Sequence, residues 1–385
     1  MKYDFDSVIN RKNTCSLKWD FFESEYPMWV ADMDFEVAPE IVSSVETRLK
    51  HPIFGYAIVG DEYYNAYINW WKRRHNFSMK KEELLFAQGV MPGITSLIRE
   101  FTKKEDNIVI QTPVYHIFFK VIKDNNRNVL ENELVYDGNT YHINFNDLEE
   151  KLSDEKTTMM LLCNPHNPIG KIWKEEDLKK IDKLCKKYDV IIVSDEIHCD
   201  LTNPDKNYIA FENISDDTSN IITSLAPTKT FNIAGIQGSV IHTCNKNFYE
   251  RIKDRLMADN SSQINVFAID ATIAAFNDSE EWLNQLNYYL YENKKFVKNF
   301  IEKEIPTIKL VKSEATYLLW IDCTGIGFKS KKISEHLLNK VGLLVSPGLQ
   351  FGLCGDNFIR LNIACPRKML EESMQKLKEG LNSIK

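Results

Sequence analysis

Short apolar runs recur along the middle of the chain and are separated by charged segments of helical length. Three of these runs are Met159–Leu162, Val190–Val193 and Asn220–Leu225, and a charged segment from about Lys174 to Tyr188 separates the first two. Strands without polar alternation are buried on both faces, as parallel strands covered by helices are. The sequence therefore predicts an α/β fold with a mostly parallel sheet.

Polar residues follow the carboxyl ends of successive predicted strands. Open α/β sheets bind their ligands outside these strand ends, so we expect the side chains to share one site. They are Tyr115, Asn167, Asp195 and Lys229. A structural role, such as a core tyrosine or a turn asparagine, explains any one of them alone. Their convergence favours a functional site.

Lys229 lies in the segment Ala226–Gly235, directly after the apolar run that ends at Leu225. This segment contains no carboxylate. A lysine without a carboxylate partner can be desolvated, which lowers its pKa and frees the amine for a Schiff base. Most of the other lysine and arginine side chains are expected to be solvated. Lys229 is therefore the candidate nucleophile.

A planar, phosphorylated pyridine aldehyde such as pyridoxal 5′-phosphate (PLP) gives each of these side chains a role. Lys229 would bind the aldehyde covalently and carry protons. Asp195 would keep the ring nitrogen protonated, so that the ring can accept electrons. Asn167 would hydrogen-bond the ring hydroxyl, and Tyr115 would stack on the ring face.

A candidate phosphate site follows a short apolar strand and the turn at Gly89. Apolar residues then recur at helical spacing, at Ile94, Leu97, Ile98 and Phe101. The free amide groups at the start of such a helix bind anions. We therefore expect the amides around Val90 and Met91 to bind the phosphate.

The order of these residues resembles that of the fold-type I PLP enzymes of the aspartate aminotransferase superfamily. The matching positions are Tyr56, Gly89, Tyr115, Asn164–Pro168, Asp195, Lys229 and Arg360. Four segments resemble, more narrowly, the MalY/PatB group of carbon–sulfur lyases: Trp29–Phe35, Asp195–His198, Ala226–Gly235 and Arg360–Pro366. The resemblance implies the type I PLP-dependent transferase fold, with a mostly parallel, seven-stranded type of sheet in a large domain and a smaller α+β domain.

The resemblance also implies which residues bind the substrate. Arg360 would clamp the substrate carboxylate. Ala31, Asp32 and Asn167 would also contact the substrate. The substrate site would thus combine the N-terminal arm with residues from both domains.

Two positions depart from the aspartate aminotransferases and agree with the lyase group. His198 stands where those enzymes have a tyrosine, and Gln237–Ser239 stand where they have an arginine. His198 would contact the cofactor, and phosphate binding would depend more on backbone amides, Thr228 and Tyr56. The resemblance implies that Tyr56 reaches the phosphate site of a neighbouring subunit, and hence that the protein is a homodimer.

The activity that this resemblance implies is β-elimination. L-Cystathionine or another cysteine S-conjugate would yield a thiol, pyruvate and ammonia, with Lys229 removing the Cα proton. An aminotransferase would use the same residues and is the first alternative. A regulatory protein that retains the enzyme fold is the second, and the intact lysine, aspartate and arginine set argues against it as the sole role.

Composition excludes several classes of partner. The formal net charge of −7 leaves no basic patch for nucleic acid or an anionic membrane. No apolar run in the sequence approaches the ~20 residues of a membrane helix, and Met1–Asp6 does not resemble a signal segment. We therefore expect a cytoplasmic protein.

The eight cysteines include no C-x-x-C pair, which predicts free thiols and no metal site.

The length of 385 residues suggests more than one domain. We expect residues 1–45 to form an N-terminal arm that contributes to the small domain. Residues 46–280 would form the large PLP-binding domain, and residues 281–385 the small C-terminal domain. A long amphipathic helix from about Glu280 to Glu304 is expected to bridge the two domains.

Overall fold

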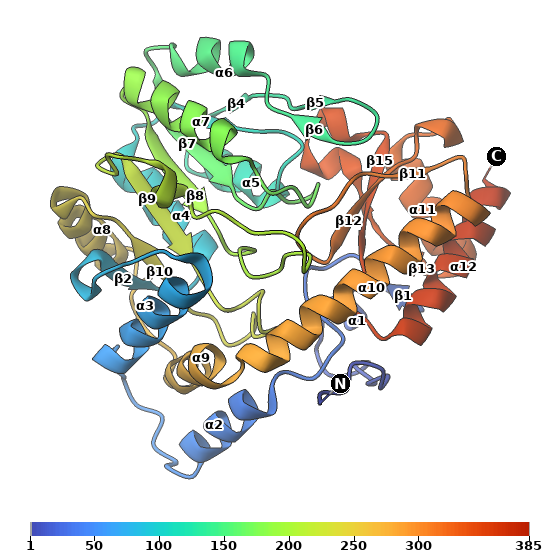
Figure 1. Cartoon of the computed structure of the whole chain (residues 1–385), viewed down its shortest axis with the longest axis horizontal. Helices are drawn as coiled ribbons and strands as arrows, with labels where there is room; N and C mark the ends of the chain where they lie inside the picture. The colour runs from blue at the N-terminus through green and yellow to red at the C-terminus, as the bar shows by residue number, and fades with distance from the viewer. Residues whose placement is uncertain (1, 385) are drawn as a thin grey trace.

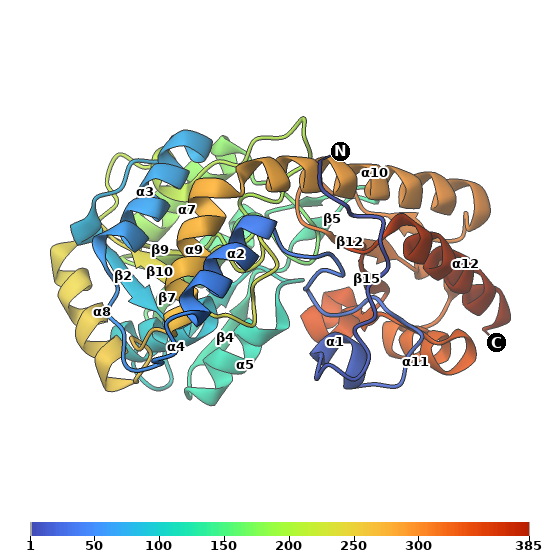
Figure 2. The same ribbon diagram turned by 90° about the horizontal axis from the view of Figure 1, so that it is seen from below.

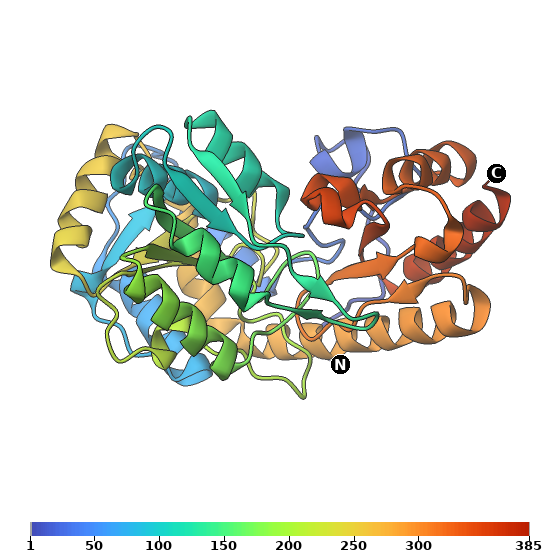
Figure 3. The ribbon, with the colours of Figure 1, turned by 90° about the horizontal axis from the view of Figure 1, so that it is seen from above.

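The computed structural model describes residues 2–384, which fold into a large and a small lobe (Figure 1). Figure 3 shows the two lobes side by side, with one long helix running along both. Among the described residues, no helix combines the length and the apolar character needed to cross a membrane. The two-lobed α/β architecture agrees with the predicted fold class.

A seven-stranded sheet forms the centre of the large lobe. Its strands, in spatial order, are β2 (Leu84–Ala87), β10 (Ser239–His242), β9 (Ile221–Leu225), β8 (Ile191–Asp195), β7 (Thr157–Cys163), β3 (Asn107–Ile110) and β4 (Asn128–Glu131). β10 runs antiparallel to both of its neighbours, β2 and β9, and all other neighbouring strands of this sheet pair in parallel. The predicted mostly parallel sheet is confirmed, and the carboxyl ends of β7, β8 and β9 share one edge.

Helices cover both faces of this sheet, which explains why its strands are apolar throughout. One face packs on α4 (Val90–Phe101), α5 (His116–Asp124) and α8 (Lys246–Ala258). The other face packs on α3 (Asp61–His75), α6 (Phe145–Leu152) and α7 (Glu175–Lys187). Beyond α3 lie α9 (Val266–Asp278) and α2 (Pro39–Leu49), which pack on each other.

The small lobe is built on a four-stranded antiparallel sheet. Its order is β11 (Lys309–Leu310), β12 (Leu318–Asp322), β15 (Phe358–Asn362) and β14 (Ser346–Pro347). Helices α11 (Ser330–Val341) and α12 (Arg367–Ser383) contribute apolar side chains to the same core. The arm joins this lobe because β1 (Tyr26–Pro27) pairs in parallel with β13 (Leu343–Leu344).

The remaining elements are short. They are α1 (Leu17–Asp20), the hairpin β5 (Val135–Tyr136) and β6 (Tyr141–His142), and the 3₁₀ turns η1 (Lys81–Glu83), η2 (Phe211–Ile214), η3 (Thr324–Ile326), η4 (Gly348–Phe351) and η5 (Leu353–Gly355). They lie at the edges of the lobes or between longer elements.

Two segments connect the lobes. Helix α10 (Glu280–Glu304) has the bounds that the sequence predicts and extends from the large lobe across the small one (Figure 2). The N-terminal arm is fixed by buried Asp34, which pairs with Lys18 and Arg11 at 2.7 Å each. The predicted arm of residues 1–45 includes the start of α2, which packs on α9 of the large lobe.

Candidate active site

A cavity of about 330 Å³ lies at the carboxyl ends of β7, β8 and β9. It collects most of the residues that the sequence singles out. Those that line it are Ala31, Val90, Met91, Tyr115, Asn167, Asp195, His198, Thr228 and Lys229. Asp32, Tyr56 and Arg360 lie outside the lining.

Lys229 reaches the cavity from the loop that follows β9. Its Nζ donates a hydrogen bond to the carbonyl oxygen of Ala31 at 2.7 Å. Burial lowers the pKa of Lys229 from its ordinary value of 10.5 to about 8. The neutral amine, the form that a nucleophile or a base needs, is therefore present near pH 8.

Asp195 is the last residue of β8 and is buried. Its Oδ1 accepts one hydrogen bond, from the backbone N–H of Ile197 at 3.2 Å. Burial raises its pKa from 3.8 to about 7. A buried carboxylate with so few donors is stabilised by a cation in the cavity, and a protonated pyridine nitrogen is such a group.

Asn167 and Arg360 join the two lobes beside the cavity. The Nη1 of Arg360 donates to Oδ1 of Asn167 at 3.2 Å, and its Nη2 donates to the carbonyl oxygen of Trp29 at 2.8 Å. The guanidinium lies 4.7 Å from the ring centroid of Phe351, and its Nε is buried without a hydrogen-bond partner. Burial lowers the pKa of Arg360 to about 10, so the group stays charged and keeps capacity for an anion.

The start of α4 lines the cavity and is the candidate phosphate site. Val90 and Met91 line it, and the first-turn amides of a helix have no acceptor within the helix. Thr228 adds a hydroxyl group. Burial lowers the pKa of His198 to about 3, so this imidazole is neutral. Among the described lining residues, Lys229 is the only lysine or arginine, so a phosphate would depend on amides and hydroxyls.

These groups fit PLP. The cavity presents a lysine amine with a lowered pKa, a buried carboxylate that lacks donors, and a helix start, which match the aldehyde, the ring nitrogen and the phosphate. Tyr115, mostly buried beside them, supplies an aromatic face. The chemistry of the donor set therefore agrees with the predicted cofactor.

Asp32 and Tyr56 have surroundings that differ from those of the lining residues. The Asp32 carboxylate pairs with Arg11 at 2.9 Å and lies 3.7 Å from Lys18, within the arm. Tyr56 is fully exposed in the loop of residues 52–60, outside the cavity. The predicted substrate contact of Asp32 and the predicted phosphate contact of Tyr56 stay predictions.

Cys163 and Tyr317 are among the side chains at or beside the cavity that were not predicted. Cys163, the last residue of β7, lines it, and its position at a strand end is the same signal that identifies Asp195. Tyr317 donates from its hydroxyl group to the carbonyl oxygen of Ala31 at 3.0 Å. It comes from the distant segment before β12, and no pattern in the sequence marks it.

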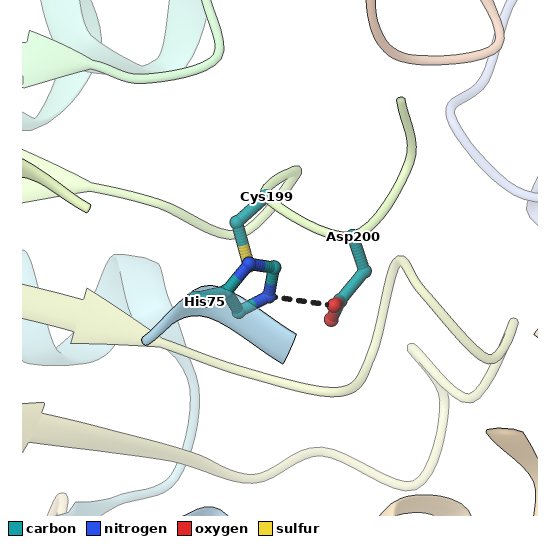
Figure 4. A group of neighbouring side chains, drawn as sticks. All are labelled: His75, Cys199 and Asp200. Atoms are coloured by element: carbon teal, nitrogen blue, oxygen red, sulfur yellow. Dashed lines mark hydrogen bonds and ion pairs between the residues drawn. The ribbon is translucent and has the colours of Figure 1, made fainter. Parts of the chain in front are cut away.

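Asp200 lies outside the cavity lining and supports the segment Ala226–Gly235, the lysine loop that carries Lys229. Its carboxylate accepts hydrogen bonds from Trp70 Nε1 at 3.1 Å and from Thr230 Oγ1 at 3.2 Å, and it contacts His75 Nε2 at 2.8 Å. Figure 4 shows His75 pointing toward Asp200. Because Thr230 is adjacent to Lys229, this buried network ties the lysine loop to α3.

The chain matches the family model described as aminotransferase class I and II over residues 32–377. It is 36% identical to cystathionine beta-lyase PatB of Bacillus subtilis, over 98% of this chain and 100% of that protein. Cystalysin from Treponema denticola, whose structure contains PLP, matches with a TM-score of 0.97 at 34% identity and covers 100% of both chains. The PLP-bound C–S lyase from Staphylococcus hominis matches with a TM-score of 0.94 at 32% identity, over 99% of this chain and 98% of that one.

Proposed function

Because the chain belongs to the aminotransferase class I and II family, we propose that it is a PLP-dependent carbon–sulfur β-lyase. Its substrate would be L-cystathionine or another cysteine S-conjugate, and its products a thiol, pyruvate and ammonia. The observation that carries the proposal is one cavity holding both the Lys229 amine and the Asp195 carboxylate, with Arg360 connected through Asn167. Relatives named as lyases match both lobes.

Each side chain has a distinct task in this reaction. PLP, when bound, supplies an electron sink for the charge that forms at the substrate Cα. Arg360 binds the substrate carboxylate, and its bonds to Asn167 and to the Trp29 carbonyl fix the orientation of the guanidinium. Lys229 Nζ takes the Cα proton, and Asp195 holds a proton on the ring nitrogen.

The lyase and aminotransferase alternatives use the same residues and differ in what leaves the substrate. A thiolate on Cβ departs readily, so β-elimination of a sulfur substrate should be faster than its transamination. L-Cystathionine should therefore release pyruvate, ammonia and homocysteine over many turnovers without a keto acid. If no thiol is released from cysteine S-conjugates while an amino donor and 2-oxoglutarate react rapidly, the protein is an aminotransferase.

The covalent role of Lys229 has a direct test. Borohydride reduction of the yellow holoenzyme, followed by peptide mass analysis, should place a pyridoxyl group on Lys229. The Lys229→Ala variant provides the matched control and should carry no adduct. An adduct on a different lysine of the wild-type chain would contradict the assignment.

The role of Arg360 is tested by two substitutions. Arg360→Ala removes the clamp and should sharply lower kcat/KM for L-cystathionine. Arg360→Lys keeps the charge but loses the planar fork that binds a carboxylate through two hydrogen bonds, so it should restore only part of the rate. Equal activity of all three proteins would show that the substrate carboxylate binds elsewhere.

We also propose that the active unit is a homodimer in which Tyr56 reaches the phosphate site of the neighbouring subunit. The support comes from the loop of residues 52–60, where Ile53, Phe54, Tyr56 and Ile58 are all exposed. Clustered apolar side chains of this kind mark protein interfaces.

Free thiols at all eight cysteines are consistent with the cytoplasmic location that we propose.

A further inference from the structure

The side chains of Glu83, His242 and Cys244 meet at the end of β10 that points away from the cavity. Gly238, just before β10, lines the cavity, whereas His242 ends the strand and is in register with Leu84 at the start of β2. The candidate ligand atoms of the three side chains lie within 4.8 Å of one another. His242 Nε2 is 3.5 Å from Glu83 Oε2.

The ring of His242 is held by a second carboxylate. Its Nδ1 lies 2.7 Å from Glu212 Oε1, and Thr223 Oγ1 donates to the same oxygen at 2.6 Å. Burial lowers the pKa of His242, but the flanking carboxylates, Glu212 first, raise it well above its ordinary value, so Nε2 carries a proton that a metal ion must displace. That Nε2 atom is buried and has no hydrogen-bond partner. Metal-binding histidines are oriented in this way by a carboxylate on the far nitrogen.

We propose that Glu83, His242 and Cys244 bind a zinc-class divalent cation through one oxygen, one nitrogen and one sulfur atom. A mixed set of this kind suits Zn²⁺, which takes four ligands, and does not suit Mg²⁺ or Ca²⁺, which prefer oxygen. Cys244 is exposed, so the cation can enter from solvent and keep water as its fourth ligand. Binding displaces two protons to solvent, the thiol proton of Cys244 and the Nε2 proton of His242.

A second group of candidate ligands, His75, Cys199 and Asp200, does not support the same proposal (Figure 4). The Asp200 carboxylate already accepts hydrogen bonds from Trp70 and Thr230. Arg74 lies 3.5 Å from it and would repel a cation. The Asp200 carboxylate is therefore already used in the hydrogen bonds that support the lysine loop.

The proposed site would link three segments that are distant in the sequence. Glu83 ends η1, His242 ends β10, and Glu212, which orients the imidazole, belongs to η2. Of the proposed ligands, only His242 and Cys244 are close in the sequence, where Thr243 alone separates them, which explains why cysteine spacing predicts no metal site. The site lies at the end of β10 that is away from the cavity, so we expect the metal to have a structural role. It would also protect the exposed thiol of Cys244.

Calorimetric titration of chelator-treated holoenzyme with Zn²⁺ tests the proposal. One equivalent should bind per chain, and thermal unfolding should shift to higher temperature. Cys244→Ser and His242→Gln should abolish this binding. Cys15→Ser is the matched control, because Cys15 is the other exposed cysteine, and this variant should bind Zn²⁺ as the wild type does. Co²⁺ in place of Zn²⁺ should give a thiolate charge-transfer absorption that Cys244→Ser lacks.

An alkylation experiment on the wild-type protein tests the site without a substitution at buried His242, which could impair folding. Zn²⁺ should slow the reaction of Cys244 with iodoacetamide and leave the rate at Cys15 unchanged, as read by peptide mass analysis. The proposal is overturned if Zn²⁺ does not bind, if it binds Cys244→Ser equally well, or if it protects both thiols alike. In these cases His242 serves only as a charged bridge between Glu83 and Glu212.

Discussion

Asp195 and Lys229 carry opposite ordinary charges, yet burial shifts the pKa of each toward the neutral form. The pKa of Asp195 rises to about 7, and that of Lys229 falls to about 8. Neither side chain has a charged hydrogen-bond partner within the described chain. Burying two such groups lowers stability, and a cofactor with a cationic ring nitrogen and an aldehyde compensates for both. Function explains the arrangement better than stability does.

Asp195→Asn tests the electrostatic part of this interpretation. The variant cannot keep the ring nitrogen protonated, so it should lose at least ~3 kcal/mol of transition-state stabilisation, more than about a hundredfold in kcat. Pyruvate release from L-cystathionine measures the rate, and absorbance of bound PLP verifies that the cofactor is retained. Near-normal turnover would mean that Asp195 is not the partner of the ring.

The same substitution should change stability in a pH-dependent way once PLP has been removed. Between its ordinary pKa of 3.8 and its folded value of about 7, Asp195 binds a proton in the folded chain but not in the unfolded chain. The contribution of Asp195 to the free energy of unfolding is therefore fully present at low pH and is lost as the pH rises through that window. Asp195→Asn should become more stable than wild type by a few kcal/mol near pH 7, since one pKa unit corresponds to about 1.4 kcal/mol.

Urea unfolding of both cofactor-free proteins measures this difference. The measurements should stay below about pH 8, because Lys229 adds its own pH dependence above that value. A difference in unfolding free energy that does not change between about pH 4 and about pH 7 would contradict the raised pKa of Asp195.

At the scale of elements, the loop that carries Lys229 depends on α3. Asp200 is fully buried and accepts from Trp70 on α3 and from Thr230 on the lysine loop. Burial alone would raise its pKa, but His75 and Arg74 hold the pKa of Asp200 below its ordinary value. The carboxylate thus acts as a charged link between α3 and the loop that carries Lys229.

Asp200→Asn should break this link. It leaves Arg74 and His75 without a buried anion, and removing one partner of such a group costs about 3 to 5 kcal/mol of unfolding free energy. Denaturant unfolding measures the loss. The control is Asp61→Asn, which removes an exposed carboxylate that pairs with Lys81 and should cost less than about 1 kcal/mol. A loss for Asp200→Asn no larger than the control would contradict the role of this link.

Element positions also decide how much of the site could be predicted from the sequence. Strand periodicity places Asp195 and Lys229 correctly, because parallel strands must end at one edge of a sheet. The same rule would have found Cys163. Tyr317 could not be predicted, because its contact with Ala31 depends on how the small lobe and the arm pack. The link through Asp200 likewise depends on the tertiary position of α3.

At the scale of the whole molecule, the loop of residues 52–60 is the clearest departure from a self-contained monomer. Arg48 Nη2 binds the carbonyl oxygen of Ile53 at 2.8 Å, and the rings of Phe54 and Phe267 lie 5.5 Å apart, so the start of the loop is anchored. Tyr56 and Ile58 nevertheless project into solvent. An anchored loop with exposed apolar side chains is suited to insertion into a second subunit.

Mixing two inactive variants tests whether Tyr56 acts across a dimer interface. Tyr56→Phe should impair the phosphate site, and Lys229→Ala removes the nucleophile. In a heterodimer, one site combines Lys229 of the first subunit with Tyr56 of the second and is intact, while the other site lacks both groups. Random mixing should restore about a quarter of wild-type β-elimination activity, because half of the dimers are mixed and each has one working site. Subunit exchange must be verified by differential tagging. If tagged heterodimers form and pyruvate release stays at the level of the unmixed variants, Tyr56 serves the site of its own subunit.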